Sequence, residues 1–247
     1  MSNSIPAYIE NRIRRPQPNA CCVVAGSSPV VSFGDATAAT VATLGLNPSC
    51  REFLDKRGVE LVGAERRLAT LNSLGTDDLQ NAPIGVIAQV LDECNSYFGP
   101  NAYGDWFGKL EEILGNIGAS YYDGSACHLD VVQWATDPTW GKLKPAGLRR
   151  WLAAQDGEFL IEQLRNENFE ILLVNGSGVM KQLERLVECD WDEYEPIVGL
   201  RRHDTQIFGA TILGRINVIA WSTNLQSSFG VTNELRQELA ERVEELA

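Results

Sequence analysis

One apolar stretch constrains the fold of this chain more than any other. Residues 40–46 form a near-continuous apolar run that breaks into the turn Gly45-Leu46-Asn47-Pro48-Ser49. Such a run is typical of a strand buried on both faces of a sheet. In open α/β sheets, ligands bind outside the carboxyl ends of the strands, where this turn would lie. Gly45 lets a ligand approach the backbone and Pro48 stiffens the turn. The alternative is that the turn serves only to start and cap the next helix.

Strands and helices alternate along the remaining sequence. We expect further strands over 29–35, 126–132, 169–174, 206–212 and 216–221, with 206–212 at an edge of the sheet. We expect helices over 61–74, 84–98, 106–117, 145–154 and 158–166, after 176–178, and from Thr232 onwards. This order predicts an α/β fold, a three-layer α/β/α sandwich with a mostly parallel central sheet. Residues 1–28 are polar and predict an extended N-terminal arm, which leaves 29–247 as a single domain.

Composition narrows the class of protein. No run of about eighteen apolar residues occurs, and the first residues lack the basic-then-apolar order of a secretory signal. We therefore expect a cytoplasmic protein with no membrane partner. The six cysteines include no C-x-x-C pair, so reduced thiols are expected in preference to a metal site, and no cofactor is predicted.

The charge is strongly acidic but uneven. A net charge of −12 argues against broad, sequence-independent attraction to DNA or another polyanion. Basic residues nevertheless cluster after the Asn47 turn and again near residue 145, either as ordinary solvated faces or as a local patch. They are Arg51, Lys56, Arg57, Arg66, Arg67, Lys142, Lys144, Arg149 and Arg150.

Three loops are expected to meet at one edge of the sheet. If their strands are parallel, the turn at Asn47, the residues after Asp130 and the loop 224–228 form one cleft. His128 and Asp130 must share a face of their strand because alternate side chains point the same way. His128 either faces the cleft or is a structural histidine of the core.

This order of parts resembles the uracil-DNA glycosylase superfamily over most of the chain beyond residue 29. The turn 45–49 is similar to the Gly-x-Asn-Pro form of the family's first motif. Leu129-Asp130-Val131-Val132 lies where the family has a central Asn-Val-Val, and the loop 224–228 occupies the place of the second motif. The segment 171–183 is similar to the family's unit of apolar strand, glycine and helix.

The resemblance implies an enzyme that binds a base rotated out of DNA and hydrolyses its N-glycosidic bond. It implies that Asn47 positions a water molecule, that Phe53 stacks on the base and that Asp130 reads the base edge. Leu225 or Gln226 would fill the gap left in the duplex. The implied substrate-binding set is completed by Gly45, Leu46, Pro48, Ser49, His128, Asn224, Ser227 and Ser228.

Two departures from the family keep an alternative open. Asp130 stands where an Asn is common, and an ionised carboxylate only accepts hydrogen bonds. The loop 224–228 also lacks the His-Pro-Ser of the second motif. The alternative is a non-catalytic member of the same fold that binds a nucleobase, a nucleotide or a protein. A basic rim around Asn47 would favour the glycosylase. A third possibility, a generic α/β hydrolase, lacks the G-x-S-x-G elbow.

Overall fold

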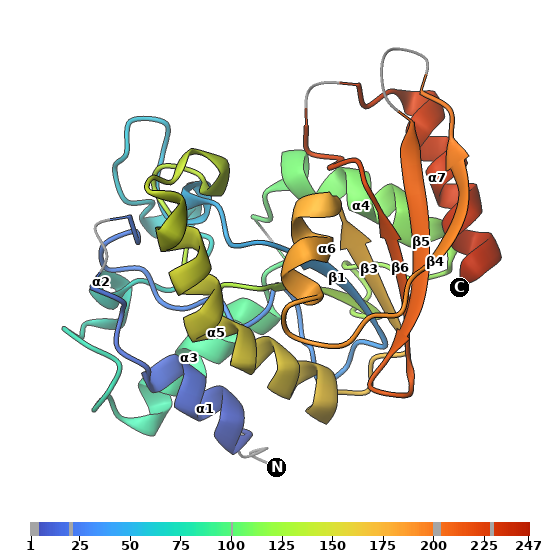
Figure 1. Cartoon of the computed structure of the whole chain (residues 1–247). Helices are drawn as coiled ribbons and strands as arrows, with labels where there is room; N and C mark the ends of the chain where they lie inside the picture. The colour runs from blue at the N-terminus through green and yellow to red at the C-terminus, as the bar shows by residue number, and fades with distance from the viewer. Residues whose placement is uncertain (1–4, 20–21, 100, 200–203, 228–229) are drawn as a thin grey trace.

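The computed structural model describes residues 5–19, 22–99, 101–199, 204–227 and 230–247. Its centre is a six-stranded mixed sheet in the order β2-β1-β3-β6-β5-β4 (Figure 1). The strands are β1 (Val41–Gly45), β2 (Ala126–Asp130), β3 (Ile171–Asn175), β4 (Asp192–Ile197), β5 (Thr205–Ile212) and β6 (Ile216–Trp221). Because β2, β1, β3 and β6 run parallel, their carboxyl ends lie at the same edge of the sheet.

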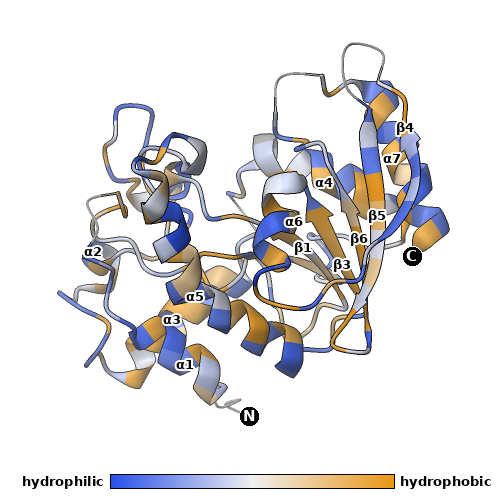
Figure 2. Ribbon diagram, viewed as in Figure 1, coloured by the Kyte–Doolittle hydropathy of each residue, from blue (hydrophilic) through white to orange (hydrophobic). Residues whose placement is uncertain are grey.

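Helices pack on both faces of this sheet, an arrangement compatible with a three-layer α/β/α sandwich. The helices are α1 (Ala7–Arg14), α2 (Leu71–Leu74), α3 (Ile84–Asn95), α4 (Gly104–Asn116), α5 (Ala146–Asn166), α6 (Ser177–Leu183) and α7 (Asn233–Leu246). Short 3-10 turns occur at Cys50–Glu52, Gly63–Glu65 and Trp140–Lys142. The central strands are mainly apolar, whereas the edge strand β4 is hydrophilic (Figure 2).

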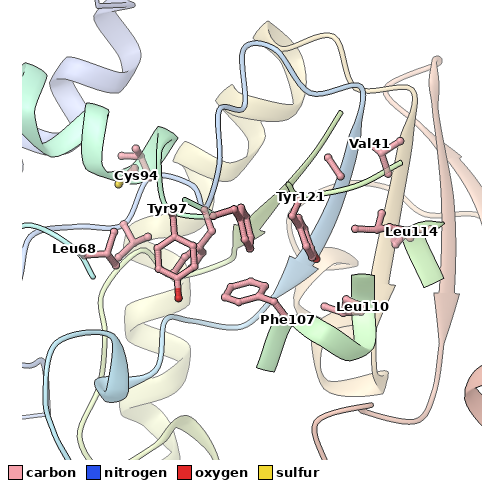
Figure 3. Packing of buried hydrophobic residues seen from close by; sticks show 14 of the residues in the cluster. Val41, Leu68, Cys94, Tyr97, Phe107, Leu110, Leu114 and Tyr121 are labelled. Atoms are coloured by element: carbon pink, nitrogen blue, oxygen red, sulfur yellow. The ribbon is translucent and has the colours of Figure 1, made fainter. Parts of the chain in front are cut away.

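Alternate residues of each central strand face different cores. Val41 of β1 packs in the cluster that contains the apolar faces of α3, α4 and α7. Ala42 and Leu44 pack in the second cluster, with α5 and α6. On the first face, Phe107 lies between Tyr97 and Tyr121 in an aromatic group beside β1 (Figure 3). This group reaches the edge of the sheet where the parallel strands end.

The prediction of an extended N-terminal arm is wrong, because α1 is part of the core. Ile9, Arg12 and Ile13 are buried at the i, i+3, i+4 spacing of one helical face. Arg12 forms an ion pair of 3.0 Å with Asp156 of α5, and both side chains are almost fully buried. The sequence conceals this helix because its buried stripe is short and includes an arginine.

The prediction that 206–212 lies at an edge of the sheet is also wrong. The acidic segment 192–197, which is not among the expected strands, forms β4, so β5 pairs on both sides. Most of β4 is exposed, and its charges and Pro196 are features that protect an edge strand from further pairing. An exposed edge strand needs no apolar run, which is why hydrophobic periodicity missed it.

Three smaller predictions differ from the structure. Residues 29–35 contain a single bridge, from Phe33 to His128, in place of a strand. Within 61–74 only α2 is an α-helix, and it ends as expected at Gly75, whose φ of 65° is left-handed. The two helices expected between 145 and 166 are the single helix α5. Tertiary packing decided each of these, because the local pattern was compatible with both arrangements.

Candidate functional site

The parallel strands bring the predicted loops together, as expected from their order. Gly45 ends β1, Asp130 ends β2, and Asn175 ends β3, while Asn224 follows β6. A cleft of about 810 Å³ opens at this edge of the sheet, with the turn 45–49, Asn175 and Asn224 in its wall. Its volume is within the range of ligand-binding sites in proteins. This outer cleft is therefore the candidate site.

Cations surround the outer cleft. They come from the turn after β1, from the start of α5 and from α6 with the turn that follows it, and they are Arg51, Arg149, Arg150, Lys181 and Arg185. No aspartate or glutamate is among the described residues that line the cleft. The five cations form no ion pair with any described carboxylate. In a chain of net charge −12, this cluster is a local excess of positive charge, which attracts anions.

Asn47 is half-buried in the wall of the cleft, and its amide is held in a defined orientation. Its Nδ2 donates to the carbonyl of Pro48 (2.9 Å), the carbonyl of Trp134 (3.2 Å) and Oγ1 of Thr136 (3.0 Å). These three acceptors assign the nitrogen end of the amide. Oδ1 accepts no hydrogen bond from the described residues, so it is available to accept one from water or a ligand.

A narrower inner pocket lies beside the outer cleft and shares four lining residues with it, Asn47, Pro48, Ser49 and Trp106. Its other lining residues are aromatic or titratable: Phe33, Phe107, Glu52, His128 and Asp130. The inner pocket has a volume of about 10 Å³, which is room for about one water molecule. Two carboxyl groups and an imidazole therefore meet in a confined space.

His128 and Asp130 lie on the same face of β2, as the alternation of the strand predicts. Nε2 of His128 is 3.5 Å from Oδ1 of Asp130. That separation is too long for a good hydrogen bond, and Oδ1 is a buried atom without a hydrogen-bond partner among the described residues. Asp130 is 4% exposed, so this unpaired oxygen is unusual.

The other side of the imidazole is part of a buried chain of hydrogen bonds. Nδ1 of His128 is 2.7 Å from Oγ1 of Thr43, which is 2.6 Å from the hydroxyl of Tyr121. The Tyr121 hydroxyl is buried and has no other partner among the described residues, so it donates to Thr43. Thr43 then donates to Nδ1, and the proton of the imidazole is on Nε2. The opposite direction would leave the Tyr121 proton without an acceptor, at a cost of about 1–3 kcal/mol.

Burial changes the titration of both carboxyl groups in the inner pocket. Burial raises the pKa of Asp130, although the neighbouring His128 lowers it. Burial also raises the pKa of Glu52, to about 7. The hydroxyl of Tyr97 donates to Oε2 of Glu52 (2.6 Å) and, with Arg67, opposes that rise, whereas Asp130 adds to it. Glu52 therefore exchanges a proton near neutral pH.

Several predicted site residues lie elsewhere. Phe53 is 2% exposed in the core and lines neither cavity, so the aromatic walls are Phe33, Trp106 and Phe107. Leu225 is fully buried. The side chain of Gln226 accepts a hydrogen bond from Asn175 and donates one to the carbonyl of Trp106, and its backbone N–H donates to Oδ1 of Asn224. In this conformation neither side chain is free to enter a duplex.

The remaining predicted residues have simpler positions. Gly45, Leu46, Pro48, Ser49 and Asn224 line the outer cleft. Ser227 is exposed, and Ser228 lies outside the described residues.

Sequence reasoning missed residues that converge only in the folded chain. Glu52 and Trp106 line the inner pocket, and Thr43 orients the imidazole. Lys181 and Arg185 complete the basic rim. Only the spacing of Lys181 and Arg185 gave a usable signal, because residues four apart share a face in a helical pattern, although Arg185 lies in the turn after α6.

No group of three or more His, Cys, Asp or Glu side chains suited to a metal ion occurs within the described ranges. Cys50, Cys94, Cys127 and Cys189 are free thiols. None of the described helices has the length and apolar character needed to cross a membrane. In comparisons with known proteins, the chain matched no family model and no curated protein.

Proposed function

We propose that this protein is a DNA glycosylase, which binds a nucleic-acid strand across the outer cleft and hydrolyses the N-glycosidic bond of a base placed in the inner pocket. The observation that carries the proposal is the basic rim: five cations and no carboxylate are found among the described residues that line the outer cleft, whose wall includes Asn47. Affinity for nucleic acid comes largely from neutralised phosphates, so a local rim can bind a strand despite the overall charge of −12.

Aromatic side chains support binding of a strand with exposed bases. Tyr103, Trp106 and Trp140 line the outer cleft among the cations. Basic grooves with interspersed aromatic rings are typical of single-stranded nucleic-acid binding, because the bases stack on the rings. A base rotated out of a duplex presents the same flat faces.

Asn47 has the geometry to orient the attacking water. Its Nδ2 is bound by three acceptors, so Oδ1 can accept a hydrogen bond from water at a defined position. An amide cannot remove the proton of that water, and loss of a general base typically costs on the order of 10²–10⁴ in rate. We therefore expect slow hydrolysis, driven mainly by loosening of the glycosidic bond.

Binding without cleavage is the second candidate. The observation that favours it is that Asn47, the residue proposed to orient the water in the wall shared by both cavities, ends in an amide, which cannot accept the proton of that water. A nucleobase-binding or nucleotide-binding protein needs the basic rim and the pocket but no activated water.

The test is incubation of the purified protein with labelled oligonucleotides, single-stranded and double-stranded, that contain uracil, hypoxanthine, xanthine or a mismatched thymine. Strand breaks after alkali that disappear in Asn47→Ala support the glycosylase. Asn81→Ala is the matched control, because Asn81 is exposed and lines neither cavity. Retention of the wild-type rate by Asn47→Ala would contradict the role of Asn47. Absence of breaks with tight binding would support the second candidate.

A further inference from the structure

We infer that His128 and Asp130 form a donor–acceptor pair that reads a nucleobase edge on which an N–H group lies next to an acceptor. This inference rests on the proposed function only in taking a base as the occupant of the inner pocket. It concerns how the base is recognised, and it holds whether or not the base is then excised.

The donor of the pair is Nε2–H of His128. The chain from Tyr121 through Thr43 to Nδ1 uses the lone pair of Nδ1, so the proton is on the nitrogen that lines the pocket. The reverse arrangement would also place a nitrogen lone pair opposite the Asp130 carboxylate. Thr43 and Tyr121 are thus positioning residues for the imidazole.

The acceptor is the carboxylate of Asp130. Its Oδ1 is buried and has no hydrogen-bond partner in the described part of the chain, although His128 is only 3.5 Å away. Buried polar atoms normally have a partner, so this oxygen points to a ligand that supplies an N–H donor. Gly45 makes the approach possible, because a Cβ there would be 2.5 Å from Oδ1 and 2.8 Å from Nε2.

Together the two residues present complementary groups 3.5 Å apart. Uracil and hypoxanthine each have an imino N–H beside a carbonyl. The N–H would donate to Asp130, and the carbonyl would accept from His128. The acceptor-only character of Asp130 is thus completed by a donor from the same strand.

The ring of His128 is itself held by aromatic neighbours. Trp106 lies edge-on to it at 4.7 Å between ring centroids, and Phe107 does so at 5.4 Å. The inner pocket has room for about one water molecule, so a base can enter only if the residues between the inner pocket and the outer cleft move. Trp106 is the aromatic side chain of the wall that both cavities share and is half-buried, so we expect it to move when a base enters.

The first experiment compares ligands that differ by one methyl group on the N–H edge. Binding of 1-methyluracil and 1,3-dimethyluracil is measured by calorimetry, together with inosine and 1-methylinosine. The first member of each pair keeps the N–H edge, and the second replaces its proton. We expect at least one first member to bind and its partner to bind about tenfold more weakly or worse, since a hydrogen bond to a charged group is lost. Equal binding within both pairs, or no binding by either first member, would overturn the inference.

A second measurement does not depend on any ligand. In protein with ¹⁵N-labelled histidine, nuclear magnetic resonance should show the proton of the buried imidazole on Nε2. Thr43→Val should redistribute that proton between the two nitrogens, because Nδ1 then has no donor. A proton on Nδ1 in the wild type would overturn the inference. Ligand discrimination without strand cleavage would leave the inference standing and refute the glycosylase. Cleavage of both 3-methylated and unmethylated uracil would support the glycosylase and overturn the inference about His128 and Asp130.

Discussion

Gly45 and Asp130 are register partners on the parallel strands β1 and β2, and the side chain of Asp130 occupies the space that a side chain at position 45 would need. A Cβ at Gly45 would lie 2.5 Å from Oδ1 of Asp130. The replacement Gly45→Ala must therefore displace Asp130, and with it His128. We expect loss of base binding and a decrease of about 1–3 kcal/mol in the free energy of unfolding, the usual cost of overpacking. Denaturant unfolding and calorimetry would measure the two effects.

The control is Gly85→Ala in α3, where a Cβ meets no atom within 4 Å. This variant should keep wild-type ligand binding, and its stability should be unchanged or slightly higher because alanine favours the helix. Wild-type ligand binding in Gly45→Ala would show that the inner pocket is not where the base is held.

Arg149 and Arg150, at the start of α5, are predicted to contact phosphates. In single-stranded DNA each contact contributes about 0.7 to the slope of log affinity against log salt concentration. The double variant Arg149→Gln/Arg150→Gln should lower that slope by about 1.4 and weaken binding at low salt. Fluorescence anisotropy over a series of salt concentrations would measure it. Arg165→Gln is the control, since Arg165 is exposed at the far end of the same helix; an equal effect there would mean that only net charge matters.

Because of the raised pKa of Glu52, we expect the free energy of unfolding to decrease as the pH rises through neutrality. Burial raises its pKa from the ordinary value of 4.5 to about 7 in the folded protein. Between these values the folded state binds more protons than the unfolded state, so the free energy of unfolding falls with increasing pH, by about 3 kcal/mol from this group. Glu52→Gln should remove most of this decrease between pH 5 and pH 8. Glu158→Gln, an exposed change on α5, should follow the wild type; identical pH profiles for Glu52→Gln and wild type would refute the assignment.

Because Arg12 of α1 pairs with the buried Asp156 of α5, we expect α1 to be needed for stability. Arg12→Leu leaves the buried carboxylate of Asp156 without its ion-pair partner, which typically costs about 3–5 kcal/mol. The double variant Arg12→Leu/Asp156→Leu should recover much of that loss, because no buried charge remains. Arg14→Leu, which breaks a half-exposed pair with Glu10, should cost about 1 kcal/mol or less. Thermal unfolding of the four proteins would compare them, and equal losses in Arg12→Leu and Arg14→Leu would contradict the buried role.

The elements that the sequence predicted well are those that carry a strong local signal. The apolar run before Asn47, the segment before Asp130 and the cap at Thr232 match β1, β2 and the start of α7. These segments are buried on both faces or capped by a neighbouring side chain, so nearby residues alone encode them. The exposed strand β4 and the short helix α1 depend on distant partners and gave no such signal.

The candidate site divides in the same way. The sequence alone determined that a Gly-x-Asn-Pro-Ser turn ends a buried strand and that His128 and Asp130 share a face, because strand alternation is a local property of the backbone. Only the tertiary structure decided that Thr43 orients the imidazole, that Glu52 faces the same pocket as Asp130, and that Lys181 and Arg185 join the earlier arginines. These relationships depend on the order of the strands in the sheet and on how the helices pack against it. Both are set by burial of apolar surface over the whole chain, which no local pattern records.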